Sequence, residues 1–363
     1  MMNHKLSDMN CKKMMLYLFA FSLLLFPACK HDELEVYQES DNYSSAADFV
    51  KNNYNLTLFH AALTQANLLD ELRKDGPYTV FAPSNKAFND LGIVRASDFA
   101  EMNQDSLRTM LQYHILPRVL YRNDIPANTI DNKYVNLAGK ELFVGYKYEK
   151  PCVTCNVRAD IYINGALAPK TTQDRVLANG VLHVLDKVLK YQTRVQDILS
   201  TKKEYSTFVT LLKRMGDWDR LAQPAYTTVF APDNQAFERA GVTISQIENL
   251  DATAYHKRLS RVYLLYNHFF ISDMDVYGKQ AGSGYYAGPF YRAPIVGDEN
   301  YYFAIASNPE KEPFIVEKRL INGNSPLRKT NLQPGYRTDY KADNGVVHGI
   351  VDLLVLPSEA KIN

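Results

Sequence analysis

Apolar residues near the start of the chain recur at a helical spacing. Four of them would share one buried face of a helix: Leu56, Phe59, Leu63 and Ala66. Ser45 and Asp48 precede this stretch with the spacing of a capping box, which favours a helix start at that point. The pattern therefore predicts helices that pack by one face.

A β-branched and aromatic run, Tyr78 to Ala82, predicts a strand after these helices. Pro83 should end the strand, because proline has no N–H to donate to a ladder. Ser84 or Asn85 can then cap a short helix. The same succession of strand, proline and capping residue occurs again at Pro232.

Two Asn-Gly dipeptides, at 179–180 and 344–345, are typical of tight turns. Each is followed by an almost continuously apolar run, Val181 to Leu189 and Val346 to Leu356. A strand without polar alternation is buried on both faces. We therefore expect both runs to be central strands of a core.

These features belong to an internal repeat. Residues 79–88 recur as residues 228–237 with eight of ten positions identical, at an offset of 149. Residues 179–183 recur as residues 344–348 at an offset of 165. Since 165 exceeds 149 by 16, the second copy has 16 additional residues between these two motifs.

A third, looser correspondence lies between the two motifs. Leu111 to Ile115 matches Leu265 to Phe269 at an offset of 154, which sets Asn267 against Tyr113 and His268 against His114. The second copy therefore departs from the Tyr-His pair of the first.

The three motifs resemble the signature of the fasciclin domain: Thr-Val-Phe-Ala-Pro-x-Asn-x-Ala-Phe, a central Tyr-His at Tyr113 and His114, and a final Asn-Gly-Val-x-His. The resemblance covers residues 43–190 and residues 191–357. It implies an α+β fold of two tandem domains, each a β-sandwich-like core with several packed helices. It also implies adhesion or ligand binding outside the cell, with no common catalytic residues and no cofactor. Because no Gly- or Ser-rich spacer separates the two copies, we expect the domains to be held close.

The N-terminus predicts export and lipidation. A basic region with Lys12 and Lys13 precedes the apolar run Met14 to Phe26, which has the length of a signal-peptide core and is too short for the ~20 residues that span a bilayer. Cys29 follows Ala28 and resembles the acylated cysteine of bacterial lipoproteins. This interpretation makes residues 1–28 a signal peptide and residues 29–42 a lipidated tether. The acidic residues that follow resemble tags for the outer face of an outer membrane.

Composition excludes some functions. The 41 basic and 40 acidic residues give a net charge of +1, which provides no electrostatic footprint for nucleic acid. Cys152 and Cys155 form a lone Cys-Val-Thr-Cys, whereas a zinc site would need two more ligands. They are interpreted as a small loop disulfide or two free thiols.

No catalytic or metal motif stands out. Four of the eight histidines lie inside repeated motifs, which favours a structural role: His114, His183, His268 and His348. The stretch Asp273 to Gly278 begins like a calcium loop but lacks two ligands. Paired carboxylates for glycoside hydrolysis depend on spatial arrangement, which the sequence does not give. We predict a protein that is not an enzyme.

The additional residues of the second copy, around Gly278 to Asn324, are rich in aromatics. Tyr301, Tyr302 and Phe303 have the pattern of a strand. A second group is predicted to lie on an exposed loop and to contact a ligand: Tyr285, Tyr286, Phe290 and Tyr291.

Three functions remain open at this stage. The first is a protein-binding adhesion module, and the second is a glycan-binding accessory protein of an outer-membrane polysaccharide-uptake system. The third is a structural spacer. All three are expected at the cell surface, with the lipid anchor in the membrane.

Overall fold

Both halves of the chain combine helices with strands in the same order along the sequence, which confirms the α+β prediction. The computed structural model describes residues 43–150, 153–154, 156–223, 226–277, 291–306, 315–320, 326–333 and 337–362. Cys29, Cys152 and Cys155 lie outside these residues.

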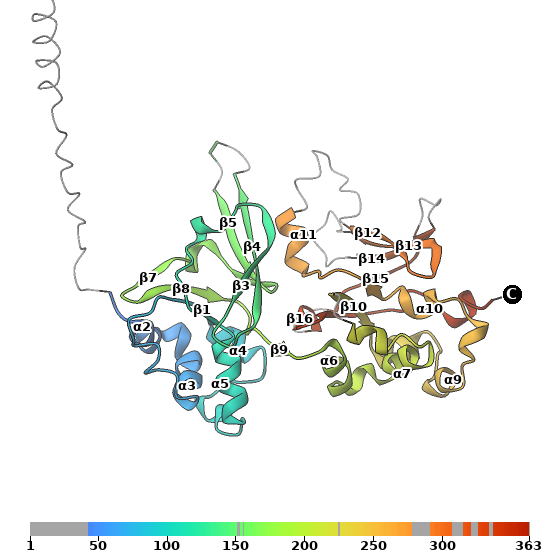
Figure 1. The fold of residues 1–363 in the computed structure, drawn as a ribbon, viewed down its shortest axis with the longest axis horizontal. Coiled ribbons are helices and arrows are strands. Elements are labelled where there is room, and N and C mark those ends of the chain that lie inside the picture. The colour runs from blue at the N-terminus through green and yellow to red at the C-terminus, as the bar shows by residue number, and fades with distance from the viewer. Residues whose placement is uncertain are drawn as a thin grey trace, which may run out of the picture. The chain divides into compact units, whose positions relative to one another are not determined.

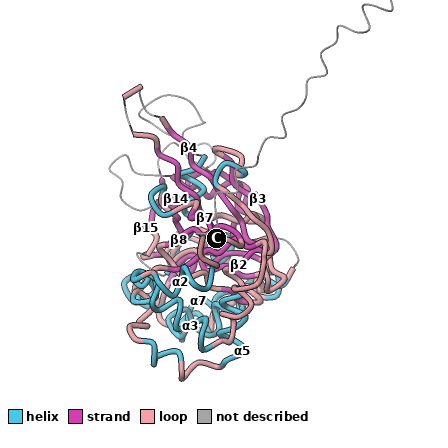
Figure 2. The backbone as a smooth tube through the Cα atoms, turned by 90° about the vertical axis from the view of Figure 1, so that its left-hand side faces the viewer, coloured by secondary structure: helices cyan, strands magenta, loops and turns pink. Residues whose placement is uncertain are grey.

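The described residues of the first half form four α-helices beside two four-stranded sheets, β2-β1-β8-β7 and β3-β4-β5-β6. The helices are α2 (Ala46–Asn52), α3 (Thr57–Gln65), α4 (Asn85–Asn89) and α5 (Gln104–Gln112). The strands are β1 (Tyr78–Pro83), β2 (Ile115–Leu116), β3 (Thr129–Val135), β4 (Glu141–Glu149), β5 (Arg158–Ile163), β6 (Ala166–Ala168), β7 (Arg175–Leu177) and β8 (Gly180–Leu185). In the two views, α3 and α5 lie on one side of these strands (Figures 1 and 2).

The sheet that contains β1 and β8 is buried on both faces. The two strands run parallel, with Val80 opposite Leu182, and both of these side chains pack in a cluster with the helices. Phe81 and Leu185 point to the other face and pack with Leu142 of the second sheet. This arrangement explains the nearly continuous apolar pattern and confirms the central position predicted for β8.

The second half repeats this plan. Its helices are α6 (Val195–Thr201), α7 (Ser206–Arg214), α8 (Asn234–Arg239), α9 (Ile244–Glu248), α10 (Arg258–Arg261) and α11 (Ile271–Tyr277). Its strands are β9 (Tyr191–Gln192), β10 (Thr227–Pro232), β11 (Leu264–Leu265), β12 (Tyr291–Ile295), β13 (Asp298–Ala306), β14 (Ile315–Leu320), β15 (Pro326–Asn331), β16 (Tyr340–Ala342) and β17 (Gly345–Ile350). The sheets have the orders β11-β10-β17-β16-β9 and β12-β13-β14-β15.

The segment that links the halves is part of a sheet. β9 begins two residues after Leu189 and pairs in parallel with β16. The link is therefore short and hydrogen-bonded. Among the described residues, no helix has the length and apolarity needed to cross a membrane.

Capping side chains begin the helices where the sequence predicts them. The Ser45 hydroxyl accepts a hydrogen bond from the N–H of Asp48 at 3.2 Å, and α2 begins at the next residue. The Ser84 hydroxyl accepts from the N–H of Ala87 at 3.2 Å and begins α4. The four apolar residues of the predicted helical face are all buried.

The middle motif of the repeat is aligned differently from the prediction. The N–H of Phe81 donates to the carbonyl of His114 at 2.9 Å, and the N–H of Phe230 donates to the carbonyl of Tyr263 at the same distance. Tyr263, 149 residues after His114, is therefore its counterpart. The predicted match between His114 and His268 is wrong. The second copy has Val262 and Tyr263 where the first has Tyr113 and His114, and His268 lies five residues further along the chain.

The predicted terminal strands are too long, since β8 ends at Leu185 and β17 at Ile350. The backbone that follows each of these strands is hydrogen-bonded by a side chain from elsewhere in the same half. The His114 ring donates from Nδ1 to the carbonyl of Met110 at 2.8 Å and accepts at Nε2 from the N–H of Leu189 at 2.9 Å. In the second half the Tyr263 hydroxyl accepts from the N–H of Leu354 at 3.1 Å.

Each Asn-Gly turn carries an asparagine whose side chain connects distant segments, and Asn179 is buried. Asn179 accepts from the N–H of Ala46 at 2.9 Å and donates to the carbonyls of Leu72 and Lys74 at 2.8 and 2.7 Å. Asn344 makes the equivalent bonds in the second half, accepting from Val195 at 2.9 Å and donating to Leu221 at 2.5 Å. These side chains join the turn to the first helix of their half.

We predict that Asn179→Ala lowers the free energy of unfolding by at least about 2 kcal/mol, because it removes three hydrogen bonds to the backbone, two of them buried. Urea denaturation followed by circular dichroism measures the change. Asn55→Ala, at an exposed position, is the matched control and should have little effect. Equal stability of Asn179→Ala and wild type would contradict this role.

We also predict that stability falls as the pH is lowered from about 6.5 to about 4. Burial lowers the pKa of His114 to about 4, whereas in the unfolded chain a histidine has a pKa near 6.5. In this window the unfolded state takes up a proton that the folded state refuses, so acid favours unfolding. His114→Gln should reduce the slope of stability against pH by up to about 1.4 kcal/mol per unit.

Urea denaturation at several pH values between 7.5 and 4.5 tests this prediction. His256→Gln, at an exposed position, should retain the wild-type slope. An unchanged slope in His114→Gln would show that His114 contributes nothing to the acid response.

Candidate functional site

Three of the four motif histidines bind the backbone inside the core. Besides His114, His183 is hydrogen-bonded through Nε2 to the carbonyl of Leu120 at 2.9 Å, and His348 is bonded in the same way to Phe269 at 2.8 Å. Burial lowers the pKa of His183 and of His348, which keeps both rings neutral. The predicted structural role is confirmed for these three residues, and none of them is positioned as a general base.

Tyr113, the other residue of the central motif, is also buried. Its hydroxyl accepts from the side-chain amide of Asn164 at 2.7 Å and donates to the carbonyl of Glu141 at 3.5 Å. Burial raises the pKa of this hydroxyl. Tyr113 therefore connects α5 to the second sheet and presents no surface to a ligand.

The stretch that begins like a calcium loop is helix α11. The Asp273 carboxylate is buried and accepts from the N–H of Phe270 at 2.8 Å, so it caps this helix. Burial raises the pKa of Asp273. Among the described residues, no group of three or more His, Cys, Asp or Glu side chains could hold a metal ion.

The aromatic residues of the second copy are only partly described. Tyr301 and Tyr302 lie on β13 as predicted, and Tyr302 is buried. Tyr291 is the first residue of β12. The remaining members of the predicted ligand loop, Tyr285, Tyr286 and Phe290, lie outside the described residues, as does the side chain of Tyr291.

A set of contacts joins the two halves, which lie in one compact unit, Ser44–Asn363. We call the residues that make its central contacts the domain junction: Phe143, Arg158, Tyr162, Tyr226, His268, Phe270 and Asp275. Elements far apart in the sequence supply them: β4 and β5 from the first half, and from the second half α11, the residues just before it and Tyr226 just before β10.

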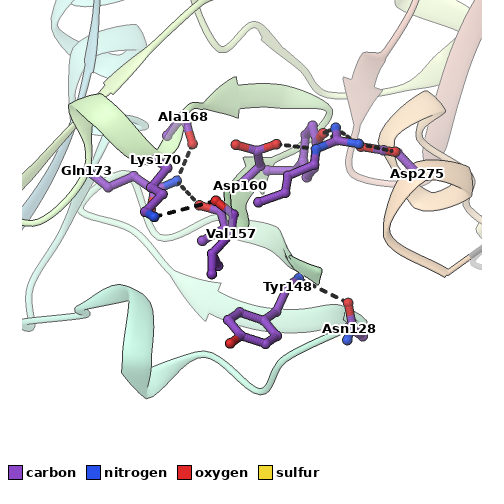
Figure 3. Close-up of polar contacts among 11 residues, drawn as sticks. Asn128, Tyr148, Val157, Asp160, Ala168, Lys170, Gln173 and Asp275 are labelled. Atoms are coloured by element: carbon purple, nitrogen blue, oxygen red, sulfur yellow. Dashed lines mark hydrogen bonds and ion pairs between the residues drawn. The ribbon is translucent and has the colours of Figure 1, made fainter. Parts of the chain in front are cut away.

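The polar part of the domain junction centres on Asp275. The Arg158 guanidinium donates to both carboxylate oxygens of Asp275. The bond from Nη1 to Oδ1 is 3.0 Å long. The Tyr162 hydroxyl donates to the same carboxylate at 2.5 Å. Figure 3 shows Asp275 of α11 joined by dashed lines to the side chains beside Asp160 of β5. A two-pronged pair of this kind fixes orientation as well as distance.

The apolar part of the domain junction centres on Phe143. This side chain forms one buried cluster with Phe270 and Val346. Its ring lies 4.4 Å from that of His268 and 5.7 Å from that of Tyr226, centroid to centroid. His268 also pairs with Asp131 of the first half. The second-copy histidine, predicted to be a structural motif residue, is therefore a contact between the halves.

Lysines surround these aromatic rings. The ammonium groups of Lys133 and Lys341 lie 5.2 and 5.4 Å from the centre of the Phe143 ring, a cation–π distance. Lys341 is buried, and burial lowers its pKa to about 8. The Tyr226 hydroxyl donates to Glu141 at 2.7 Å, which lowers the pKa of Glu141. The junction thus excludes water from part of a charged cluster.

Sequence patterns indicated the junction only faintly. Residues 142–146 of β4 form a nearly continuous apolar run, and such a run signals burial on both faces of a strand. Leu142 and Val144 face the core of the first half, so Phe143 must face elsewhere. Arg158 and Asp275 lie outside the repeated motifs, and no local signal pairs them.

Two segments of the chain match the family model described as the fasciclin domain, residues 54–191 and residues 203–357. Among curated proteins, periostin of Homo sapiens is 27% identical over 205 residues, which make up 56% of this chain and 22% of periostin. Protein sll1483 of Synechocystis is 29% identical over 152 residues, 41% of this chain and 75% of the relative. Transforming growth factor-beta-induced protein ig-h3 of Sus scrofa is 26% identical over 195 residues, 51% of this chain and 26% of the relative.

The chain thus spans only about a quarter of the length of periostin and of the ig-h3 protein. A solved FAS1 domain pair from the insect cell adhesion molecule fasciclin I aligns with 84% of this chain and 98% of its own length, at 20% identity and a TM-score of 0.38. The family match covers most of the chain in two consecutive segments. The chain belongs to the fasciclin family and carries two tandem fasciclin domains.

Proposed function

We propose that this protein is a non-catalytic adhesion or ligand-binding lipoprotein of the cell surface, anchored in the outer membrane by acyl chains on Cys29. The observation that carries the proposal is the match of both halves to the fasciclin domain. Its partner would be an extracellular protein or a glycan, since the balanced charge offers nothing to nucleic acid.

The fate of the chemically reactive side chains supports a binding role. A general base needs a free ring nitrogen within reach of a substrate proton. His114, His183 and His348 are buried and hydrogen-bonded to the backbone. The ionic cluster around Asp275 joins the two domains.

The domain junction supports presentation of the two domains as one unit. A pair of domains in fixed orientation pays less entropy on binding an extended partner than two freely jointed domains. The short hydrogen-bonded link at β9 acts in the same direction. A glycan-binding accessory protein of a polysaccharide-uptake system is the second candidate, favoured by the aromatic content of the second copy.

Adhesion of whole cells tests the proposal. Cells that carry the wild-type protein should attach to surfaces coated with collagen, fibronectin, starch or xylan more strongly than cells with Cys29→Ser, which would release the protein. Labelled palmitate should enter the wild-type protein and not Cys29→Ser. Cys11→Ser is the control and should behave as wild type, because Cys11 lies in the predicted signal peptide.

Attachment to the polysaccharides alone would favour the second candidate. Equal attachment of all three strains to every surface would contradict the adhesion role. Palmitate in Cys29→Ser would contradict the anchor.

We predict that Phe143→Ala uncouples the unfolding of the two domains. The substitution empties the centre of the apolar cluster, and truncation of a buried phenylalanine costs about 3–5 kcal/mol. Calorimetry of residues 30–363 should change from one transition to two. Phe99→Ala, which empties a site in the helical core of the first domain alone, is the control and should destabilise that domain without removing the contacts at the junction. A single transition in Phe143→Ala would show that the contacts of Phe143 are not what couples the unfolding of the two domains.

A further inference from the structure

An exposed tyrosine borders a hollow at the start of the first domain. Tyr54 begins the short 3-10 helix η1 (Tyr54–Leu56) and is 81% exposed. Single exposed apolar residues are common on protein surfaces and need no explanation. Tyr54, however, lies beside a hollow of about 220 Å³. It is lined by Ser44, Phe49, Asn52, Asn53 and Tyr54.

The fold uses the backbone of Tyr54 and not its ring. The side-chain amide of Asn85 donates to the carbonyl of Tyr54 at 2.9 Å, and its oxygen accepts from the N–H of Leu58 at 2.9 Å. These bonds hold the turn in place. In the second domain, 149 residues later, Asn234 donates in the same way to the carbonyl of Lys203 at 3.1 Å.

The side chain at this position therefore differs between two domains that share the backbone contact. A residue required for folding would be expected to keep its character in both. Lys203 is exposed in the second domain, as Tyr54 is in the first. Only the first domain has an aromatic ring at this position, so the ring is not part of what the two domains need in order to fold.

The chemistry of the hollow matches a neutral sugar. None of its five lining residues carries a charge. Tyrosine offers a flat apolar face with a polar tip, which suits the apolar face of a pyranose ring. Asparagine amides both donate and accept, which suits the hydroxyls at the edge of the same ring. The Asn53 side chain is already oriented, since it accepts from the N–H of Asn55 at 2.9 Å.

The size of the hollow restricts the ligand further. Pockets for drug-sized ligands have volumes of roughly 300–1,000 Å³, whereas this one holds about 220 Å³. It is large enough for one sugar ring and open enough for the chain to continue on either side. We propose that Tyr54, Asn52 and Asn53 form a subsite for one neutral hexose or pentose unit of a polysaccharide.

The subsite rests on the ligand-binding function proposed above and specifies one class of ligand. Ser44 lines the hollow and lies 15 residues after Cys29. At about 3.3–3.6 Å per extended residue the tether could separate the subsite from the membrane by no more than roughly 50 Å. A lipid-anchored protein would thus meet polysaccharides close to the cell surface at this site.

Affinity electrophoresis of residues 30–363 through gels that carry starch, xylan or mannan tests the subsite. This protein includes the whole compact unit Ser44–Asn363. Wild type should be retarded in at least one gel, and Tyr54→Ala should weaken the affinity about tenfold. Tyr54→Phe keeps the ring and should retain most of the retardation. Tyr54→Lys, the residue of the second domain, should lose it.

Tyr148→Ala, at another exposed tyrosine, is the matched control and should migrate as wild type. Thermal unfolding of each variant checks the fold, which an exposed side chain should leave unchanged. Equal retardation of wild type and Tyr54→Ala would overturn the subsite, and so would the absence of retardation in every gel. Neither result bears on attachment of cells to collagen or fibronectin, so failure of the subsite is distinguishable from failure of the adhesion role.

Discussion

The structure depends on two parallel strand pairs, β1 with β8 and β10 with β17, each covered on both faces. A parallel pair joins segments that are distant in sequence, so the chain must close a long loop before the pairing forms. The apolar side chains on both faces offset that entropy. Asn179 and Asn344 then fix the end of each pair by binding the first helix of the same domain. Every other element is placed relative to these strands.

Comparison of the two domains shows that some hydrogen bonds are present in both although different residues make them. The segments that follow β8 and β17 need an acceptor for one backbone N–H each, at Leu189 and at Leu354. A histidine ring supplies it in the first domain and a tyrosine hydroxyl in the second. Both are large side chains of the residue just before β2 or β11, and both bring a polar atom into an apolar core. The hydrogen bond is conserved between the domains while the residue differs. Matching residues by identity therefore aligned His268 with His114 incorrectly.

Sequence patterns predicted most of the fold because its signals are local. Caps at Ser45 and Ser84, the proline after each first strand and the two Asn-Gly turns all act within a few residues. The domain junction could not be predicted in the same way. Arg158 and Asp275 are 117 residues apart. Neither belongs to a recognisable motif in its own segment. The repeat gives no information on contacts between the two copies. Only Phe143 left a trace, as an apolar residue where alternation would place a polar one.

This difference between shared and unshared residues also separates folding from function in the fasciclin pair. Side chains that recur in both copies, or are replaced by others with the same bond, are explained by the domain itself. Those that do not recur divide into two groups. Phe143, Tyr226 and His268 are covered by the other domain, so their use is visible in the structure. Tyr54 remains exposed beside a hollow, although its backbone contact is the same as that of Lys203. It is this ring together with its hollow, and not the exposed ring alone, that we assign to a ligand outside the chain.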